Sequence, residues 1–144
     1  MNGFLMTREK GINLVEKYFD DGLFFKDLSR RVAIETESQN PKKISKLYQY
    51  LIKEITPYLR KMGFKCKIYE NPDREFKGPF LLANRIEDPN LPTILTYGHA
   101  DVVRGQKNEW REGLSPWIVV KEKIGCMVEG LQTIKDNIQS ILLQ

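Results

Sequence analysis

The chain has 144 residues, of which 41% are hydrophobic and 29% charged, and its 23 Lys and Arg against 19 Asp and Glu give a net charge of +4. This composition excludes a disordered segment, and the length suffices for one domain that needs no disulfide or metal on grounds of size. The basic residues form no uninterrupted block and no apolar run could cross a bilayer, so neither a nucleic-acid-binding arm nor a membrane span is expected.

The first part of the chain predicts two helices and a loop. Apolar residues recur at steps of three and four from Thr7 to Val32, and Gly22 is where this helical segment is expected to break in two. The polar stretch 35–41 ends in Pro41 and predicts a loop.

A further helix is predicted from Lys42 to Met62, with a kink at Pro57 and with Gly63 at the position of a C-terminal cap. Its apolar residues keep helical spacing: Ile44, Leu47, Tyr48, Leu51, Ile52, Ile55, Leu59 and Met62.

Three strands are predicted after this helix. Apolar and basic residues alternate over 64–68, and two more candidates are Pro79–Ile86 and Thr93–Tyr97, the last ended by Gly98. Helices followed by strands favour an α/β fold in which a sheet packs under helices. Because no helix separates the last two strands, part of that sheet would lack a second covering layer, which indicates an incomplete chain.

The two cysteines, Cys66 and Cys126, are far apart and form neither a metal-binding pair nor a disulfide framework. Residues 1–10 lack the features of a secretory signal. We therefore expect a cytoplasmic protein, with Cys66 as a small apolar residue of its strand.

His99 is the only histidine, and it follows the third predicted strand, with Asp101 two residues later. Open α/β sheets bind ligands beyond the carboxyl ends of their strands. A neutral imidazole is a good zinc ligand, and a neighbouring carboxylate can orient such a ligand. Since zinc needs at least three protein ligands, this pair alone is a weak signal, and a structural histidine is the alternative.

The surrounding sequence is more specific. Residues 91–103 are Leu-Pro-Thr-Ile-Leu-Thr-Tyr-Gly-His-Ala-Asp-Val-Val, and residues 109–117 are Glu-Trp-Arg-Glu-Gly-Leu-Ser-Pro-Trp. Together they resemble the first metal motif of metallopeptidase family twenty, which contains aminoacylases, acetylornithine deacetylases, glutamate carboxypeptidases and dipeptidases. The resemblance extends over residues 31–39 and 80–89.

The resemblance implies the N-terminal part of a zinc-exopeptidase-like catalytic domain, with helices followed by strands of a mixed sheet. It also implies two zinc ions, with His99 as a metal ligand and Asp101 as the active-site carboxylate that holds a ligand in position. The substrates would be small peptides or N-acyl amino acids. The bridging Asp, the Glu that acts as base and the last His lie downstream in the family, and none can be matched here.

The resemblance stops at residue 121. The family continues with Y-G-R-G-x-x-D-x-K-G, whereas residues 121–130 are Lys-Glu-Lys-Ile-Gly-Cys-Met-Val-Glu-Gly. Codons for residues 126–138, read from the third base of the Cys126 codon, permit Tyr-Gly-Arg-Gly-Thr-Ala-Asp-Asn-Lys-Gly-Gln-His. We therefore predict that 1–120 is the hydrolase part and 121–144 an out-of-frame tail. The alternative is an amphipathic C-terminal helix built on Ile134, Ile138, Ile141 and Leu142.

The leading hypothesis is a truncated zinc-dependent amide or peptide hydrolase, dipeptidase-like or deacylase-like, that is inactive by itself. The sequence leaves two protein partners open: a second copy of the chain in a homodimer, or a complementing downstream fragment. The alternative is a small stand-alone α/β binding or assembly protein. A third hypothesis, a nucleic-acid-binding protein, is supported only by the isoelectric point of about 9.0.

Two expectations about packing follow. The truncated sheet would leave four apolar residues partly uncovered, so that the chain folds poorly by itself: Leu81, Ile86, Ile94 and Leu95. Trp110 and Trp117 are expected to pack in the core or at its rim rather than to line a cleft.

Overall fold

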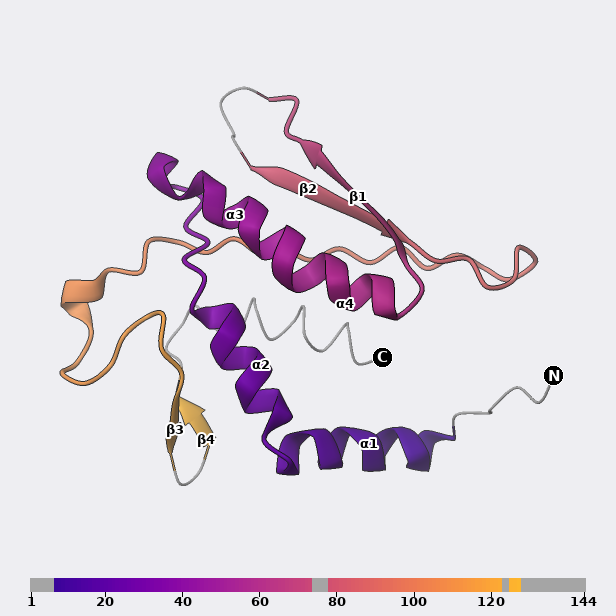
Figure 1. The fold of residues 1–144 in the computed structure, drawn as a ribbon, viewed down its shortest axis with the longest axis horizontal. Helices are drawn as coiled ribbons and strands as arrows, with labels where there is room; N and C mark the ends of the chain where they lie inside the picture. Colours follow the sequence, from indigo (N-terminus) through magenta and orange to yellow (C-terminus); the bar gives the residue numbers. More distant parts are fainter. Residues whose placement is uncertain (1–6, 74–77, 123–124, 128–144) are drawn as a thin grey trace.

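A computed structural model describes residues 7–73, 78–122 and 125–127 of the protein (Figure 1). Helices occupy the first part of the chain, and short antiparallel strands follow them. This arrangement confirms the expected mixed helix-and-strand class. Within the residues described, no helix is both long and apolar enough to cross a membrane.

Two helices form the N-terminal part, as predicted. α1 (Arg8–Asp20) begins after Thr7, whose side chain accepts a hydrogen bond from the backbone N–H of Lys10. Gly22 separates α1 from α2 (Leu23–Val32) with φ 72°, a left-handed conformation that glycine adopts without steric cost. α1 consequently projects sideways from the end of α2 (Figure 1).

The next helical segment is continuous in space but changes its winding. A 3₁₀ turn (Pro41–Lys43) leads into α3 (Ile44–Tyr50), a π-helical turn follows (Leu51–Ile55), and α4 (Thr56–Lys61) completes it. The π-helical turn lies immediately before α4, and the predicted kink at Pro57 stays a prediction. Because Pro57 lies in the first turn of α4, its missing N–H is tolerated there.

Gly63 ends this helical segment as predicted, with φ 85°. Its N–H donates to the carbonyl of Arg60 at 3.0 Å, and the N–H of Phe64 donates to the carbonyl of Leu59 at 3.0 Å. This pair of hydrogen bonds is the Schellman motif, which satisfies the last carbonyls of a helix.

The first two predicted strands form an antiparallel hairpin. β1 (Lys65–Glu70) pairs with β2 (Pro79–Asn84), in a register that places Lys65 opposite Asn84 and Glu70 opposite Pro79. The second strand ends two residues earlier than predicted. Half-buried and exposed side chains alternate along most of both strands, so one face of the hairpin packs against the helices.

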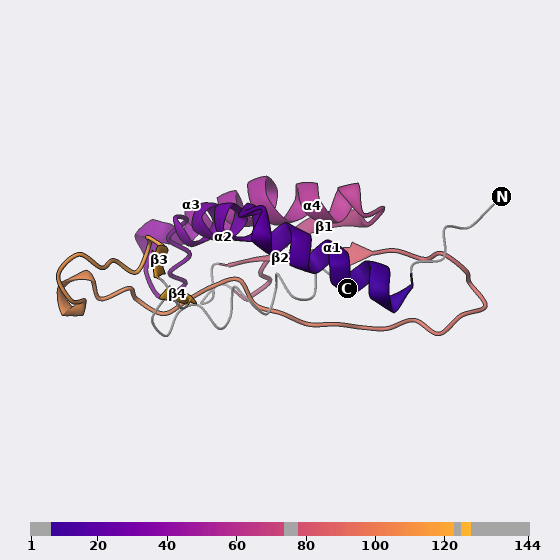
Figure 2. The same cartoon turned by 90° about the horizontal axis from the view of Figure 1, so that it is seen from below.

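The predicted third strand is wrong. Thr93–Tyr97 makes no strand pairing, and the side chains of Ile94, Leu95 and Tyr97 are 86%, 91% and 85% exposed. A strand exists only with a backbone partner, and within the described part of the chain nothing pairs with this segment. After β2 the chain instead runs past the end of α4, turns back and crosses the length of the molecule on the side away from the helices (Figures 1 and 2).

The expected uncovered surface is largely present. Ile86, like Ile94 and Leu95, is exposed, which confirms the prediction for these three residues. Leu81 packs against the buried cluster of Ile34, Tyr50 and Ile55 but is itself only partly buried, so it too is partly uncovered as predicted. Whether the chain folds poorly as a consequence stays a prediction.

The start of the predicted out-of-frame tail forms a short antiparallel pair. β3 (Val120–Glu122) pairs with β4 (Gly125–Met127). The four apolar residues of the alternative C-terminal helix lie outside the described residues: Ile134, Ile138, Ile141 and Leu142.

The buried apolar residues form two clusters. Leu28 and Val32 of α2 pack against Val119, close to the start of β3. The second cluster, built on Ile34, Tyr50 and Ile55, joins the helices to the hairpin and includes Ala100 at its edge. The segment that carries His99 is therefore attached to the helical part of the core.

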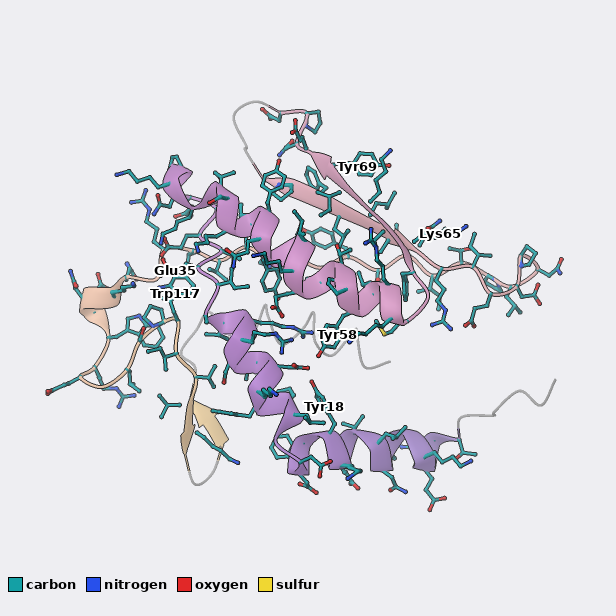
Figure 3. The ribbon with its side chains drawn as sticks, in the orientation of Figure 1. Tyr18, Glu35, Tyr58, Lys65, Tyr69 and Trp117 are labelled. Carbon is teal, nitrogen blue, oxygen red and sulfur yellow. The ribbon has the colours of Figure 1, made fainter. Side chains whose placement is uncertain are left out.

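A buried carboxylate joins the helices. Asp27 of α2 is 7% exposed and accepts hydrogen bonds from Tyr18 of α1 (2.5 Å), from Tyr58 of α4 and from Arg30 (2.6 Å). Arg30 also donates to Glu54 at 2.7 Å. The two tyrosines reach the region beside α2 from different helices (Figure 3). A polar network therefore links α1, α2 and α4.

Neighbouring groups set the ionisation of this network. Burial acts to raise the pKa of Asp27, but the hydrogen bonds from Tyr18, Tyr58 and Arg30 outweigh it and hold the pKa below its usual value. Burial and the hydrogen bond to Asp27 raise the pKa of Tyr18. Asp27 is thus held as a carboxylate at neutral pH.

We predict that Asp27→Asn lowers the free energy of unfolding at pH 7 by about 2–4 kcal/mol, because an amide cannot accept these charge-assisted hydrogen bonds as a carboxylate does. The folded-state pKa of Asp27 lies below 3.8, so the difference between wild type and variant is complete above that pH. It shrinks as the pH falls through the folded-state pKa. Urea denaturation at several pH values measures it. The exposed Asp20→Asn is the control, and an equal loss there would contradict the prediction.

Candidate metal-binding segment

A buried threonine fixes the position of the His99 segment. The N–H of Val102 donates to the carbonyl of Thr36 at 2.9 Å, and the N–H of Ser38 donates to the carbonyl of Val102 at 3.3 Å. The hydroxyl of Thr36, a fully buried residue, donates to the carbonyl of Ala100 at 2.8 Å. These bonds form a parallel bridge and hold the backbone on both sides of Asp101.

A second attachment lies three residues further on. The side chain of Glu37 accepts a hydrogen bond from the N–H of Gly105 at 2.8 Å, and the indole of Trp110 donates to the carbonyl of Gly105 at 2.7 Å. A Cβ at Gly105 would lie only 2.7 Å from the ring of Trp117. Glycine is therefore required here, because the backbone passes directly against an aromatic ring.

The tryptophans pack as expected. Trp117 is 7% exposed and lies against Gly105, and Trp110 is half-buried beside the 3₁₀ turn Lys107–Glu109. Both side chains stabilise the loop that follows the His99 segment.

Glu35 adds an electrostatic attachment at the start of the same loop. Its carboxylate pairs with Lys43 and, at 3.6 Å, with Lys107. The Lys43 ammonium, supported by Lys107, holds the pKa of Glu35 below its usual value. Glu35 therefore joins the loop after α2 to the turn before α3 and to the loop after His99.

His99 and Asp101 form a close pair. Nδ1 of His99 lies 3.2 Å from Oδ1 of Asp101 and 3.2 Å from the carbonyl oxygen of Asp101, and both side chains are close to half exposed. When Nδ1 carries the proton, it donates to Asp101, and the lone pair of Nε2 is then available to a metal. This is the carboxylate–histidine arrangement of protein metal sites.

The described residues do not complete a metal site. Among them, no group of three or more His, Cys, Asp or Glu side chains is placed to hold a metal ion. A zinc site needs three or four protein ligands, whereas the segment provides one imidazole and one carboxylate. His99 and Asp101 fit the role of one ligand and its orienting group, but they do not fit a zinc centre by themselves.

The sequence identified His99 and Asp101 but not what positions them. Thr36 and Glu37 act through contacts with residues more than 60 positions away. Local periodicity carries no signal for such contacts.

Comparisons with known proteins give no further information. No family model, curated protein or solved structure matches this chain.

We predict that Thr36→Val lowers the free energy of unfolding by about 1–3 kcal/mol. The substitution keeps the shape of the side chain but removes the donor to the Ala100 carbonyl, and an unsatisfied buried acceptor carries a cost of that size. Urea denaturation measures this loss. In the control, Ser38→Ala, the hydroxyl is exposed and the change is expected to stay within about 0.5 kcal/mol. Equal effects at both positions would contradict the attachment.

Proposed function

We propose that residues 1–120 are the N-terminal part of a zinc-dependent hydrolase of peptide or N-acyl amide bonds, and that the 144-residue chain is not itself a catalyst. The observation that carries this proposal is the His99–Asp101 pair, in which Nδ1 of the imidazole faces the carboxylate. The sequence around the pair supports it, through its resemblance to the first metal motif of metallopeptidase family twenty.

The missing ligands support the second half of the proposal. Family members hold two zinc ions with residues that lie downstream of the first motif, and these residues have no counterpart here. The His99 segment supplies one imidazole and one carboxylate, which are too few for a zinc centre, and among the described residues no group of three possible ligands is placed to hold a metal. The remaining metal ligands and the base would have to come from sequence encoded in the shifted reading frame.

The exposed segment before His99 is consistent with a part of a larger protein. Ile94, Leu95 and Tyr97 lie immediately N-terminal to the metal motif and are almost completely exposed. Isolated soluble proteins seldom leave such a contiguous apolar stretch uncovered, so an additional protein layer is expected over it in the complete enzyme. The substrate class, dipeptides or N-acyl amino acids, rests on the family resemblance alone.

The decisive experiment is the nucleotide sequence from the codon of Lys121 onward. We predict that the shifted frame encodes the motif with the bridging Asp and continues through a Glu-Glu pair to a late His. The reason is that codons for residues 126–138, when read in the shifted frame, can encode that motif. A stop in the shifted frame before the Lys-Gly codons would refute the proposal and favour a stand-alone binding protein.

We further predict that the purified chain binds zinc with a Kd no tighter than about 1 μM and hydrolyses neither dipeptides nor N-acyl amino acids, because one imidazole cannot form a closed zinc site. Calorimetry with zinc alone tests the affinity. Tight stoichiometric binding that disappears in His99→Ala would contradict this prediction and indicate a site shared between chains.

A further inference from the structure

The two edges of the β1–β2 hairpin differ in charge. β1 carries Lys65, Lys67 and Glu70 within six residues, whereas β2 carries no charged residue. Within the described part of the chain, each strand pairs only with the other, so both have a free edge. Charged residues, lysine above all, protect an exposed strand edge from pairing with another strand. The edge of β1 is therefore protected, and the edge of β2 is open to a further strand.

The same chain contains a strand-like segment without a partner. Thr93–Tyr97 is uncharged, three of its five residues are β-branched, and Pro92 and Gly98 bound it. Its apolar side chains are at least 85% exposed, and it makes no strand pairing with β2. Within the described part of the chain, β2 thus presents an open edge and Thr93–Tyr97 is a strand-like segment without a pairing partner.

We propose that two copies of the chain exchange these elements, so that Thr93–Tyr97 of one copy adds as a strand to the β2 edge of the other. The pairing is reciprocal: each copy gives its 93–97 segment to the β2 edge of the other. The two copies are related by a two-fold axis, which closes the dimer. Neither element is charged, so no like charges meet, whereas pairing through β1 would place Lys65 and Lys67 in the interface. This inference is independent of the proposed hydrolase function.

Exposed side chains on the outer face of the hairpin would gain neighbours from the same pairing. Phe80 and Leu82 of β2 point away from the helices and are 55% and 57% exposed. A strand added beside β2 places its side chains next to them as cross-strand neighbours, which stabilises apolar and β-branched pairs. The pairing therefore gives the exposed side chains of β2 apolar neighbours and gives the 93–97 segment a backbone partner.

Sedimentation equilibrium of the full 144-residue chain over a range of concentrations tests the proposal. We expect a dimer, and we expect Leu82→Lys on the β2 edge and Leu95→Lys in the segment each to weaken dimerisation at least about tenfold. Both residues are exposed, so neither substitution disturbs the buried core. Leu14→Lys is the matched control, because Leu14 is 56% exposed on α1, and it is expected to leave the dimer intact. Circular dichroism verifies that each variant is folded.

Mixing the two interface variants distinguishes reciprocal strand exchange from dimerisation through another surface. The Leu95→Lys chain keeps an intact β2 edge, and the Leu82→Lys chain keeps an intact segment. One of the two pairings is therefore complete in the mixture, and a heterodimer is expected where neither variant dimerises alone. A wild-type monomer at all concentrations, loss of the dimer in Leu14→Lys, or no heterodimer in the mixture would overturn the proposal. So would a wild-type monomer that associates only with the polypeptide encoded in the shifted frame.

Discussion

The buried hydrogen bonds of Thr36 are the interaction on which the arrangement of this protein depends. The chain from Arg85 to Gln106 contains no helix and no strand of its own, and what positions it is its attachment to the loop after α2. Thr36 binds Ala100 through its hydroxyl and Val102 through its carbonyl, and the neighbouring Glu37 binds Gly105. Together with the packing of Ala100 against the apolar cluster, these bonds fix the His99–Asp101 pair relative to the helices.

The helices in turn depend on a charged network as much as on apolar contacts. α1 has no buried residue, and its link to the rest includes Tyr18 on Asp27 and ring contacts of Tyr18 and Phe19 with Phe24. Arg31, which is 2% exposed, lies with its guanidinium 4.7 Å from the ring centre of Tyr58. Such networks stabilise a fold when every member has its partners, and removing one member then has a large cost.

The uncovered apolar surface connects the two proposals. A small protein gains stability by burying apolar area, yet this chain exposes Ile94, Leu95 and Tyr97 directly before His99. In a complete hydrolase, further sequence would cover this surface and supply the absent ligands beside His99. In the chain as it stands, a second copy offers a cover that the charge pattern of the hairpin permits.

The sequence by itself determined the local structure. Helical spacing gave the extent of the helices, Gly22 and Gly63 marked their ends through positive φ, and alternation identified β1. These features depend on neighbours within a few residues, which is why they could be predicted. The sequence also singled out His99 with Asp101 as its neighbouring carboxylate, and the two side chains lie 3.2 Å apart within one short segment.

Tertiary structure decided what depends on distant partners. Thr93–Tyr97 has the composition of a strand but forms none, because backbone hydrogen bonds require a neighbour that the described chain does not place beside it. The roles of Thr36 and of Asp27 were likewise invisible in the sequence, since their partners lie on other elements. Local preference can specify a conformation, but only the folded chain brings together a buried polar group and the partner that satisfies it.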